Sequence, residues 1–201
     1  KRFGTSKDPV LPEYLLRMNQ QVDQLTGLVI DLLDVSKIKA DKLVLEEKVF
    51  DFDPLAVELV KSCQLLSLRH TIALKGKTKA SVLGDRNSIG RVFTNLLVNA
   101  MKYSPAADKI IVTLSSTKTD VCVSIQDFGI GIAKIHKDKI FQRFFQVDNE
   151  SGQNFSGLGI GLYISEAVVA QHNGRIWVES EGAKRGSTFF FTLPLKATKN
   201  K

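Results

Sequence analysis

Apolar residues near the start of the chain recur in alternating steps of three and four. The series is Leu15, Met18, Val22, Leu25, Val29 and Leu32. This spacing is typical of the seam of a helical bundle, because positions three and four apart share one face of a helix. Pro12 suits the first turn of such a helix. We therefore expect a helix over about residues 12–40 that packs against a second copy or an absent helix; packing on the rest of the same chain is the alternative.

The remaining segments alternate between strand and helix patterns. Asp53 and Pro54 are expected to cap and open a helix that runs to about Leu68, and a longer helix is expected between Asp85 and Pro105. The further expected elements are a helix at 158–172 and strands at 48–51, 70–74, 81–83, 109–115, 120–126, 175–179 and 187–193. This order predicts an α+β fold. It is a two-layer sandwich of a mostly antiparallel mixed sheet covered by helices, preceded by one long bundle-forming helix.

Composition narrows the function classes. The net charge of +7 comes from 28 basic and 21 acidic residues with no dense basic block, so nucleic-acid binding is not indicated. Cys63 and Cys122 are too few for a disulfide framework and indicate a reducing compartment. The sequence contains no apolar run of about 20 residues, so it predicts no membrane span in this chain. The chain begins with Lys1 and not with Met, so we expect it to be a piece of a longer protein. We expect this piece to be cytoplasmic, and the longer protein could be anchored in a membrane.

The helix before Pro105 carries a polar stripe. Asn99, Lys102 and Tyr103 follow Asn95 by four, seven and eight residues and share its face of the helix. Asn is a mediocre helix former, and a solvated face more often carries Glu, Gln or Lys. Two carboxamides and an ammonium suit an anionic ligand that carries a metal ion. The alternative is an ordinary exposed face of an amphipathic helix.

A carboxylate ends the strand at 120–126. Val121, Val123 and Ile125 face one side of the strand, and Asp127 continues that side. A carboxylate placed there is costly unless a donor meets it, and the amine of a base such as adenine would be one. Phe128-Gly129-Ile130-Gly131-Ile132 follows, where glycines let a ligand approach the backbone. The alternative is an Asp that caps its own turn.

A second glycine segment opens the last expected helix. Gly157-Leu158-Gly159-Ile160-Gly161-Leu162 would expose backbone N–H groups at a helix N-terminus, which favours an anion. No strand pattern precedes this segment, which argues against a dinucleotide-binding fold.

Taken in this order, the three segments resemble the ATP-binding domain of sensor histidine kinases, within the wider group that includes gyrase B, MutL and the Hsp-type chaperone ATPases. Asn95–Ser104 resembles the N box of that family, and Asp127–Gly131 and Gly157–Leu162 resemble its two glycine boxes. Phe141–Phe145 is similar to the F box between them. The resemblance covers about residues 45–195 and implies a Bergerat-type ATP-binding fold.

The resemblance also implies roles for single residues. Asn99 would ligate Mg²⁺, and Asn95, Lys102 and Tyr103 would contact phosphates or ribose. Asp127 would accept from the adenine amine, and residues about 146–157 would form a mobile lid. The implied catalytic residues are Asn95, Asn99 and Lys102. The implied nucleotide-binding residues are these three with Tyr103, Asp127, Gly129, Gly131, Ile132, Phe144, Gly157, Leu158, Gly159, Ile160, Gly161 and Leu162.

The residue type at position 95 distinguishes the gyrase-like ATPases of this group from the kinases. The gyrase-like ATPases place a Glu one turn before the magnesium-binding Asn, where it activates water, and a carboxamide is no general base. Attack by water should therefore be slow, and the γ-phosphoryl should be kept for a protein acceptor. The alternatives are an ATP hydrolase or a serine-directed anti-sigma kinase of the same fold, or a non-catalytic nucleotide-binding scaffold.

None of the three histidines has the place or the acidic neighbour of a phosphoacceptor in the resembled family. They are His70, His136 and His172. We therefore expect residues 1–44 to be the second helix of a dimerisation domain and residues 45–201 to be the catalytic domain. The phosphoryl group of ATP would pass to a His on an absent helix and then to an Asp of a response regulator. The helix at 12–40 would form a homodimer, and this chain alone would bind Mg·ATP without phosphorylating itself.

Overall fold

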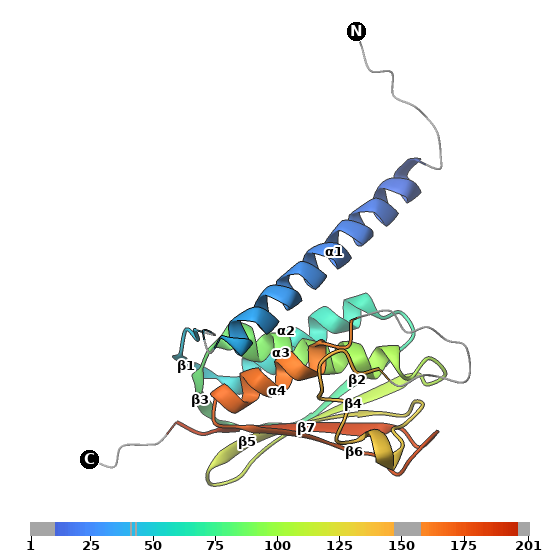
Figure 1. The fold of residues 1–201 in the computed structure, drawn as a ribbon. Coiled ribbons are helices and arrows are strands. Elements are labelled where there is room, and N and C mark those ends of the chain that lie inside the picture. Colours follow the sequence, from blue (N-terminus) through green and yellow to red (C-terminus); the bar gives the residue numbers. More distant parts are fainter. Residues whose placement is uncertain (1–10, 41, 43, 147–157, 197–201) are drawn as a thin grey trace. The chain divides into compact units, whose positions relative to one another are not determined.

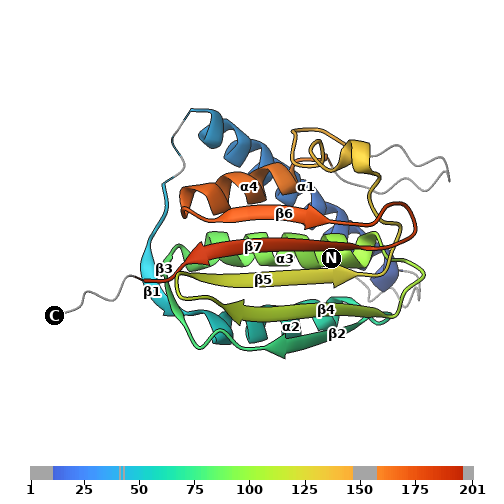
Figure 2. The same cartoon turned by 90° about the horizontal axis from the view of Figure 1, so that it is seen from below.

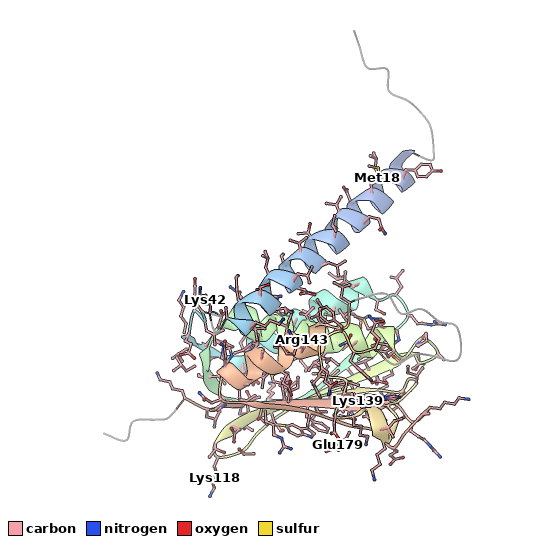
Figure 3. The ribbon with its side chains drawn as sticks, in the orientation of Figure 1. Met18, Lys42, Lys118, Lys139, Arg143 and Glu179 are labelled. Atoms are coloured by element: carbon pink, nitrogen blue, oxygen red, sulfur yellow. The ribbon has the colours of Figure 1, made fainter. Side chains whose placement is uncertain are left out.

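The structure is a computed structural model that describes residues 11–40, 42, 44–146 and 158–196. The chain divides into two units, residues 1–42 and 43–201, and each is considered by itself. The first contains helix α1 (Leu11–Lys39), close to the range that the heptad spacing predicts. Its seam residues are exposed, from 45% for Leu32 to 63% for Met18, which projects from the helix in Figure 3.

The second unit is a sheet covered by helices. Its elements are β1 (Lys48–Asp51), α2 (Phe52–Leu66), β2 (Thr71–Gly76), β3 (Ser81–Gly84), α3 (Arg86–Lys102), β4 (Lys109–Ser116), β5 (Asp120–Asp127), the 3₁₀ turn η1 (Lys134–His136), α4 (Gly161–Gln171), β6 (Arg175–Glu179) and β7 (Ser187–Pro194). Five strands form a sheet in the order β2-β4-β5-β7-β6, and β1 pairs with β3. Only β2 and β4 run parallel in the described sheets. Helices α2, α3 and α4 lie on one face of the large sheet, which confirms the predicted α+β sandwich (Figures 1 and 2).

The core lies between this sheet and the helices. Along β5, Val121, Val123 and Ile125 are fully buried, as their period-two spacing predicts. The ring of Phe191 on β7 meets the rings of Phe93 and Phe52 edge-on, with centroids 6.3 and 6.4 Å apart. These rings join α3 and α2 to the sheet.

Two predicted helix starts are wrong. Helix α2 begins at Phe52, and the N-cap position is Asp51, because β1 runs directly into the helix. The Asp53 carboxylate instead accepts from the backbone N–H groups of Thr78 and Lys79, at 2.7 and 3.0 Å. Helix α4 begins at Gly161, three residues later than predicted, because Gly159 has φ +68° and cannot continue a right-handed helix.

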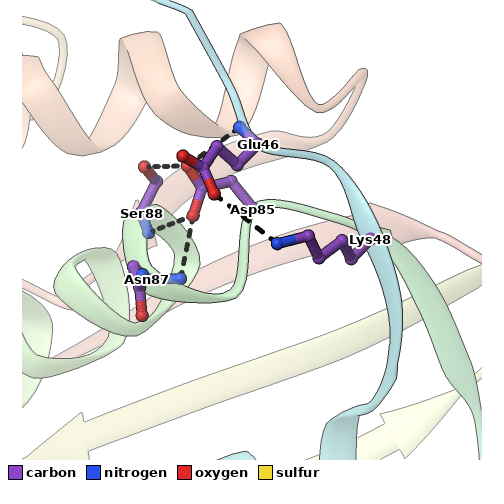
Figure 4. Close-up of polar contacts among 5 residues, drawn as sticks. All are labelled: Glu46, Lys48, Asp85, Asn87 and Ser88. Atoms are coloured by element: carbon purple, nitrogen blue, oxygen red, sulfur yellow. Dashed lines mark hydrogen bonds and ion pairs between the residues drawn. The ribbon is translucent and has the colours of Figure 1, made fainter.

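The start of α3 is capped as predicted. The Asp85 carboxylate accepts from the backbone N–H groups of Asn87 and Ser88, at 2.9 and 3.1 Å, and from that of Glu46 at 3.3 Å (Figure 4). The backbone N–H of Asp85 donates to Nε2 of His172, 2.9 Å away. Because the other ring nitrogen of buried His172 donates to a carbonyl of α4, this histidine joins the end of α4 to the start of α3.

Candidate functional site

The polar stripe of α3 lies at the edge of the core and not on a solvated face. Asn95, Asn99, Lys102 and Tyr103 are all half-buried, while the opposite side of the helix is packed in the core. The Lys102 ammonium lies 4.7 Å from the centre of the Tyr103 ring, a cation–π distance. The helix thus presents two carboxamides and one cation along a partly enclosed surface.

Asp127 ends β5 with only 4% of its surface exposed. Its Oδ1 accepts from the backbone N–H of Gly129 at 2.9 Å, so it caps its own turn as the simpler interpretation predicts. Burial raises the pKa of this carboxyl to about 6, although hydrogen bonds from the backbone of Gly129 and Ser187 act to lower it. A buried carboxyl with a raised pKa is a candidate for ligand binding, because its charged form is costly to bury unless a partner meets it.

The first glycine segment is pressed against the end of α3. A Cβ on Gly129 would lie 1.9 Å from the carbonyl oxygen of Tyr103, so only glycine fits there. The next backbone N–H, that of Ile130, donates to the same carbonyl at 3.0 Å. This contact fixes Asp127 and the Tyr103 end of the stripe beside one another.

The second glycine segment meets the phenylalanine cluster and the stripe. Phe144 donates its backbone N–H to the Gly159 carbonyl at 3.0 Å, and Phe144 itself has φ +62° with 60% of its surface exposed. A positive φ is unusual for a bulky residue and is common at functional sites. A Cβ on Gly161 would lie 2.6 Å from Oδ1 of Asn95. Arg143, labelled in Figure 3, lies over the ring of Tyr163 on α4, 5.4 Å from its centre.

The structure therefore brings most of the predicted residues into one region. Ile160 is buried, Leu162 is half-buried and Leu158 is 37% exposed near the start of α4. Ile132 is held elsewhere, since its backbone N–H donates to the hydroxyl of Ser180 at 3.0 Å. Gly157 and most of the predicted lid lie outside the described residues.

Sequence reasoning missed two buried polar residues next to the stripe. The hydroxyl of Ser165 on α4 accepts from Nδ2 of Asn95 at 2.9 Å. The ring of His70 reaches the carbonyl of Ser104, just beyond the stripe, at 3.0 Å, and Ser67 at 2.9 Å. Neither the contact of Ser165 with Asn95 nor that of His70 with Ser104 leaves a pattern in the sequence, because each joins residues that are far apart along the chain.

A hollow of about 320 Å³ lies outside this region. It is lined by Lys134, Lys137, Asp138, Ser180, Glu181 and Gly182. None of these belongs to the predicted nucleotide-binding set, and the hollow holds lysines and carboxylates in near balance. Because it offers no stripe of amides, and because Gly182 lies outside both glycine segments, it is not the site that the sequence predicts.

Comparison with known proteins places this region in a family. Residues 84–197 match the family described as histidine kinase-, DNA gyrase B-, and HSP90-like ATPases. Over 197 residues, 95% of this chain is 32% identical to the sensor protein kinase WalK of Staphylococcus aureus and covers 47% of it. In WalK proteins of individual strains the covered share is 32%, so the chain spans a third to a half of these relatives.

Solved structures agree with the sequence matches. ShkA, crystallised full-length in complex with AMPPNP, superposes with a TM-score of 0.76 at 25% identity, over 93% of this chain and 39% of that one. The histidine kinase AdeS of Acinetobacter baumannii superposes with a TM-score of 0.72 at 27% identity, over 95% of this chain and 87% of that one. No helix in the described part of the chain is long and apolar enough to cross a membrane.

Proposed function

Because this chain belongs to the family of histidine kinase-, DNA gyrase B-, and HSP90-like ATPases, we propose that the α3 stripe, Asp127 and the second glycine segment form the Mg·ATP site of a sensor histidine kinase. The domain itself is a histidine kinase catalytic ATP-binding domain, as its relatives and its fold agree, and it binds nucleotide. The observation that carries the site is the buried Asp127 held beside the half-buried stripe by the Tyr103 carbonyl.

Each part of the site suits one part of the nucleotide. The Asp127 carboxylate accepts from the exocyclic amine of adenine, which adds a donor to those of the Gly129 and Ser187 backbone. The Lys102 ammonium meets the phosphate charge, and the Leu158–Leu162 backbone approaches the phosphate chain at the start of α4.

The donor set fits Mg²⁺ bound mainly through the nucleotide. The described residues contain no group of three or more His, Cys, Asp or Glu that could hold a metal ion by itself. The half-buried Asn99 carboxamide has no hydrogen-bond partner among the described residues, so its oxygen is available to a hard cation that keeps phosphate and water ligands. When bound, the ion neutralises charge on the phosphates.

The same residues favour transfer to a protein over hydrolysis. A carboxamide such as that of Asn95 cannot take a proton from water, and no carboxylate occupies its place on the stripe. We place the acceptor His on a helix that pairs with α1, with the phosphoryl group passing on to an Asp of a response regulator. In this arrangement residues 1–44 are half of a dimerisation domain, α1 forms a homodimer, and the reaction takes place in the cytoplasm.

Calorimetric titration with AMPPNP, with and without Mg²⁺, tests the site. N99A should weaken binding about tenfold or more in the presence of Mg²⁺ and little without it, which corresponds to about 1.4 kcal/mol. K102A should weaken binding in both conditions, because it removes a charge that meets the phosphates directly. The matched control is N87A, on an exposed side chain in the first turn of the same helix. Unchanged affinity in both N99A and K102A would reject the site.

Incubation with γ-labelled ATP tests the direction of transfer. The chain alone should bind the nucleotide yet remain unlabelled, since no described histidine lies on α1. Acid-labile label on this chain would contradict the proposed place of the acceptor.

A further inference from the structure

Ser165 joins the stripe to the start of α4. Only 2% of its surface is exposed. Its hydroxyl donates to the carbonyl of Gly161, one turn earlier in α4, at 2.9 Å. The same oxygen accepts from Nδ2 of Asn95 on α3, also at 2.9 Å. One buried hydroxyl therefore contacts both the second glycine segment and the first carboxamide of the stripe.

The chemistry of a hydroxyl fixes the direction of that carboxamide. Ser165 has one hydroxyl proton, and a carbonyl such as that of Gly161 can only accept it. Towards Asn95 the hydroxyl can therefore only accept, so the NH₂ group of the carboxamide must face Ser165 and its oxygen must face away.

The oxygen that faces away lies against the glycine segment. A Cβ added to Gly161 would come within 2.6 Å of Oδ1 of Asn95, so this glycine leaves room for the carboxamide. Among the described residues nothing donates to Oδ1. Asn95 thus turns an acceptor, Oδ1, away from Ser165, while one of its two Nδ2 protons is held by the hydroxyl.

We propose that Ser165 is a positioning residue that holds the Asn95 carboxamide with its oxygen, and not its NH₂ group, turned to the nucleotide. This rests on the proposed Mg·ATP site. A carbonyl oxygen is repelled by phosphate oxygens and attracted to donors and to cations. Through Oδ1, Asn95 therefore serves the bound nucleotide by accepting from a hydroxyl or from a water held by Mg²⁺.

We call the contact of Ser165 with the Asn95 carboxamide the clamp. Proton exchange in the nucleotide-free chain tests it directly. In ¹⁵N NMR spectra the Nδ2 protons of Asn95 should exchange slowly with solvent, because one is held by Ser165. S165A should remove that protection. S165C should remove it too, since a thiol fills nearly the same space but is a weak partner. S165T should retain it, because a helical Thr can still donate to the carbonyl one turn back. Circular dichroism checks that each variant is folded.

The matched control is S36A. Ser36 on α1 also donates to the carbonyl four residues back, at 3.1 Å, but it belongs to neither the stripe nor α4. This variant should leave the Asn95 protons protected. Slow exchange that survives in both folded S165A and S165C would overturn the clamp, whatever the chain binds.

Titration with Mg·AMPPNP tests the consequence. S165A and S165C should weaken binding about three- to tenfold, the loss expected for one hydrogen bond, and S165T should restore affinity. If the wild-type chain binds but S165A and S165C bind equally well, the proposed function stands and the positioning role is rejected. If the wild-type chain does not bind, the proposed function and the role toward nucleotide both fail, while the exchange data still decide the clamp.

Discussion

At the scale of single residues, Asp127 both caps its own turn and is buried in the fold. Its carboxylate caps the turn to Gly129, which any loop Asp could do, yet the side chain is almost wholly enclosed. Enclosure disfavours the charged form, and this explains why the pKa stands at about 6 when the ordinary value is 3.8. The chain retains a carboxyl whose ionisation at neutral pH weakens the fold, as expected where an adenine amine is the partner.

Replacing Asp127 with Asn should reveal this penalty. Between pH 3.8 and about 6 the folded wild type binds more protons than the unfolded chain, so its free energy of unfolding falls as the pH rises through that window. D127N has no carboxyl at this position, so its free energy of unfolding lacks this dependence on pH. The stability of D127N relative to wild type should therefore increase from pH 4 to pH 6, by up to about 3 kcal/mol, and stay level above. Urea unfolding at a series of pH values measures the difference, and a flat difference would contradict the buried, raised pKa.

The residues of the site were largely predictable, but their mutual contacts were not. Period-two alternation placed Asp127 at the inner end of β5, and helical spacing placed Asn95 and Asn99 on one face. The role of Ser165 could not be predicted, because it depends on how α4 crosses α3. The close approach at Gly129 was predicted for a ligand, whereas the atom that requires glycine there is the protein's own Tyr103 carbonyl.

At the scale of elements, the ends of the helices depend on contacts that local sequence does not contain. The hairpins β4–β5 and β6–β7 pair strands that follow one another along the chain, and alternation predicted all four strands. The parallel pairing of β2 with β4 joins strands separated by α3, so no turn signal announces it. The start of α2 was misplaced because the Asp53 carboxylate is used by a distant loop.

The cap of α3 offers a test at this scale. Burial raises the pKa of Asp85, but hydrogen bonds from Ser88, Glu46 and Asn87 outweigh it and hold the pKa below its ordinary value. This stabilisation is present above pH 3.8 and is lost as the pH falls below it. At neutral pH, D85A should lower the free energy of unfolding by about 1–2 kcal/mol.

The control for D85A is D51A, at the same cap position of α2. Asp51 accepts nothing from the backbone of its helix, so its loss should cost less. Thermal unfolding of the two variants compares them, and equal losses would contradict a capping role for Asp85.

At the scale of the whole molecule, the chain joins a catalytic unit to a helix whose apolar seam is exposed. A run of exposed residues at heptad spacing is costly in water, and association of helices removes that cost. The spacing predicted the helix correctly. The partner that covers the seam stays a prediction, because a pattern of apolar positions specifies a surface and not its occupant.

Leu25 tests self-association. The wild-type chain should sediment as a concentration-dependent dimer, and L25K should shift it to monomer, because a charge in the seam must then be buried in apolar surroundings. G27K places the same charge on the opposite side of α1 and should leave the dimer intact. A wild-type chain that remains monomeric at high concentration would reject α1 as a sufficient dimer contact.

The division into two units has a practical consequence through the single tryptophan. Trp177 lies on β6 and stacks on Phe190 of β7, with ring centres 4.9 Å apart, and α1 contains no tryptophan. Tryptophan fluorescence, excited selectively over that of tyrosine, therefore reports melting of the sheet alone, whereas far-ultraviolet ellipticity sums α1 and the catalytic unit. If the two units melt independently, the two optical signals will have different midpoints, and a single two-state fit of either one will misstate the stability of the chain.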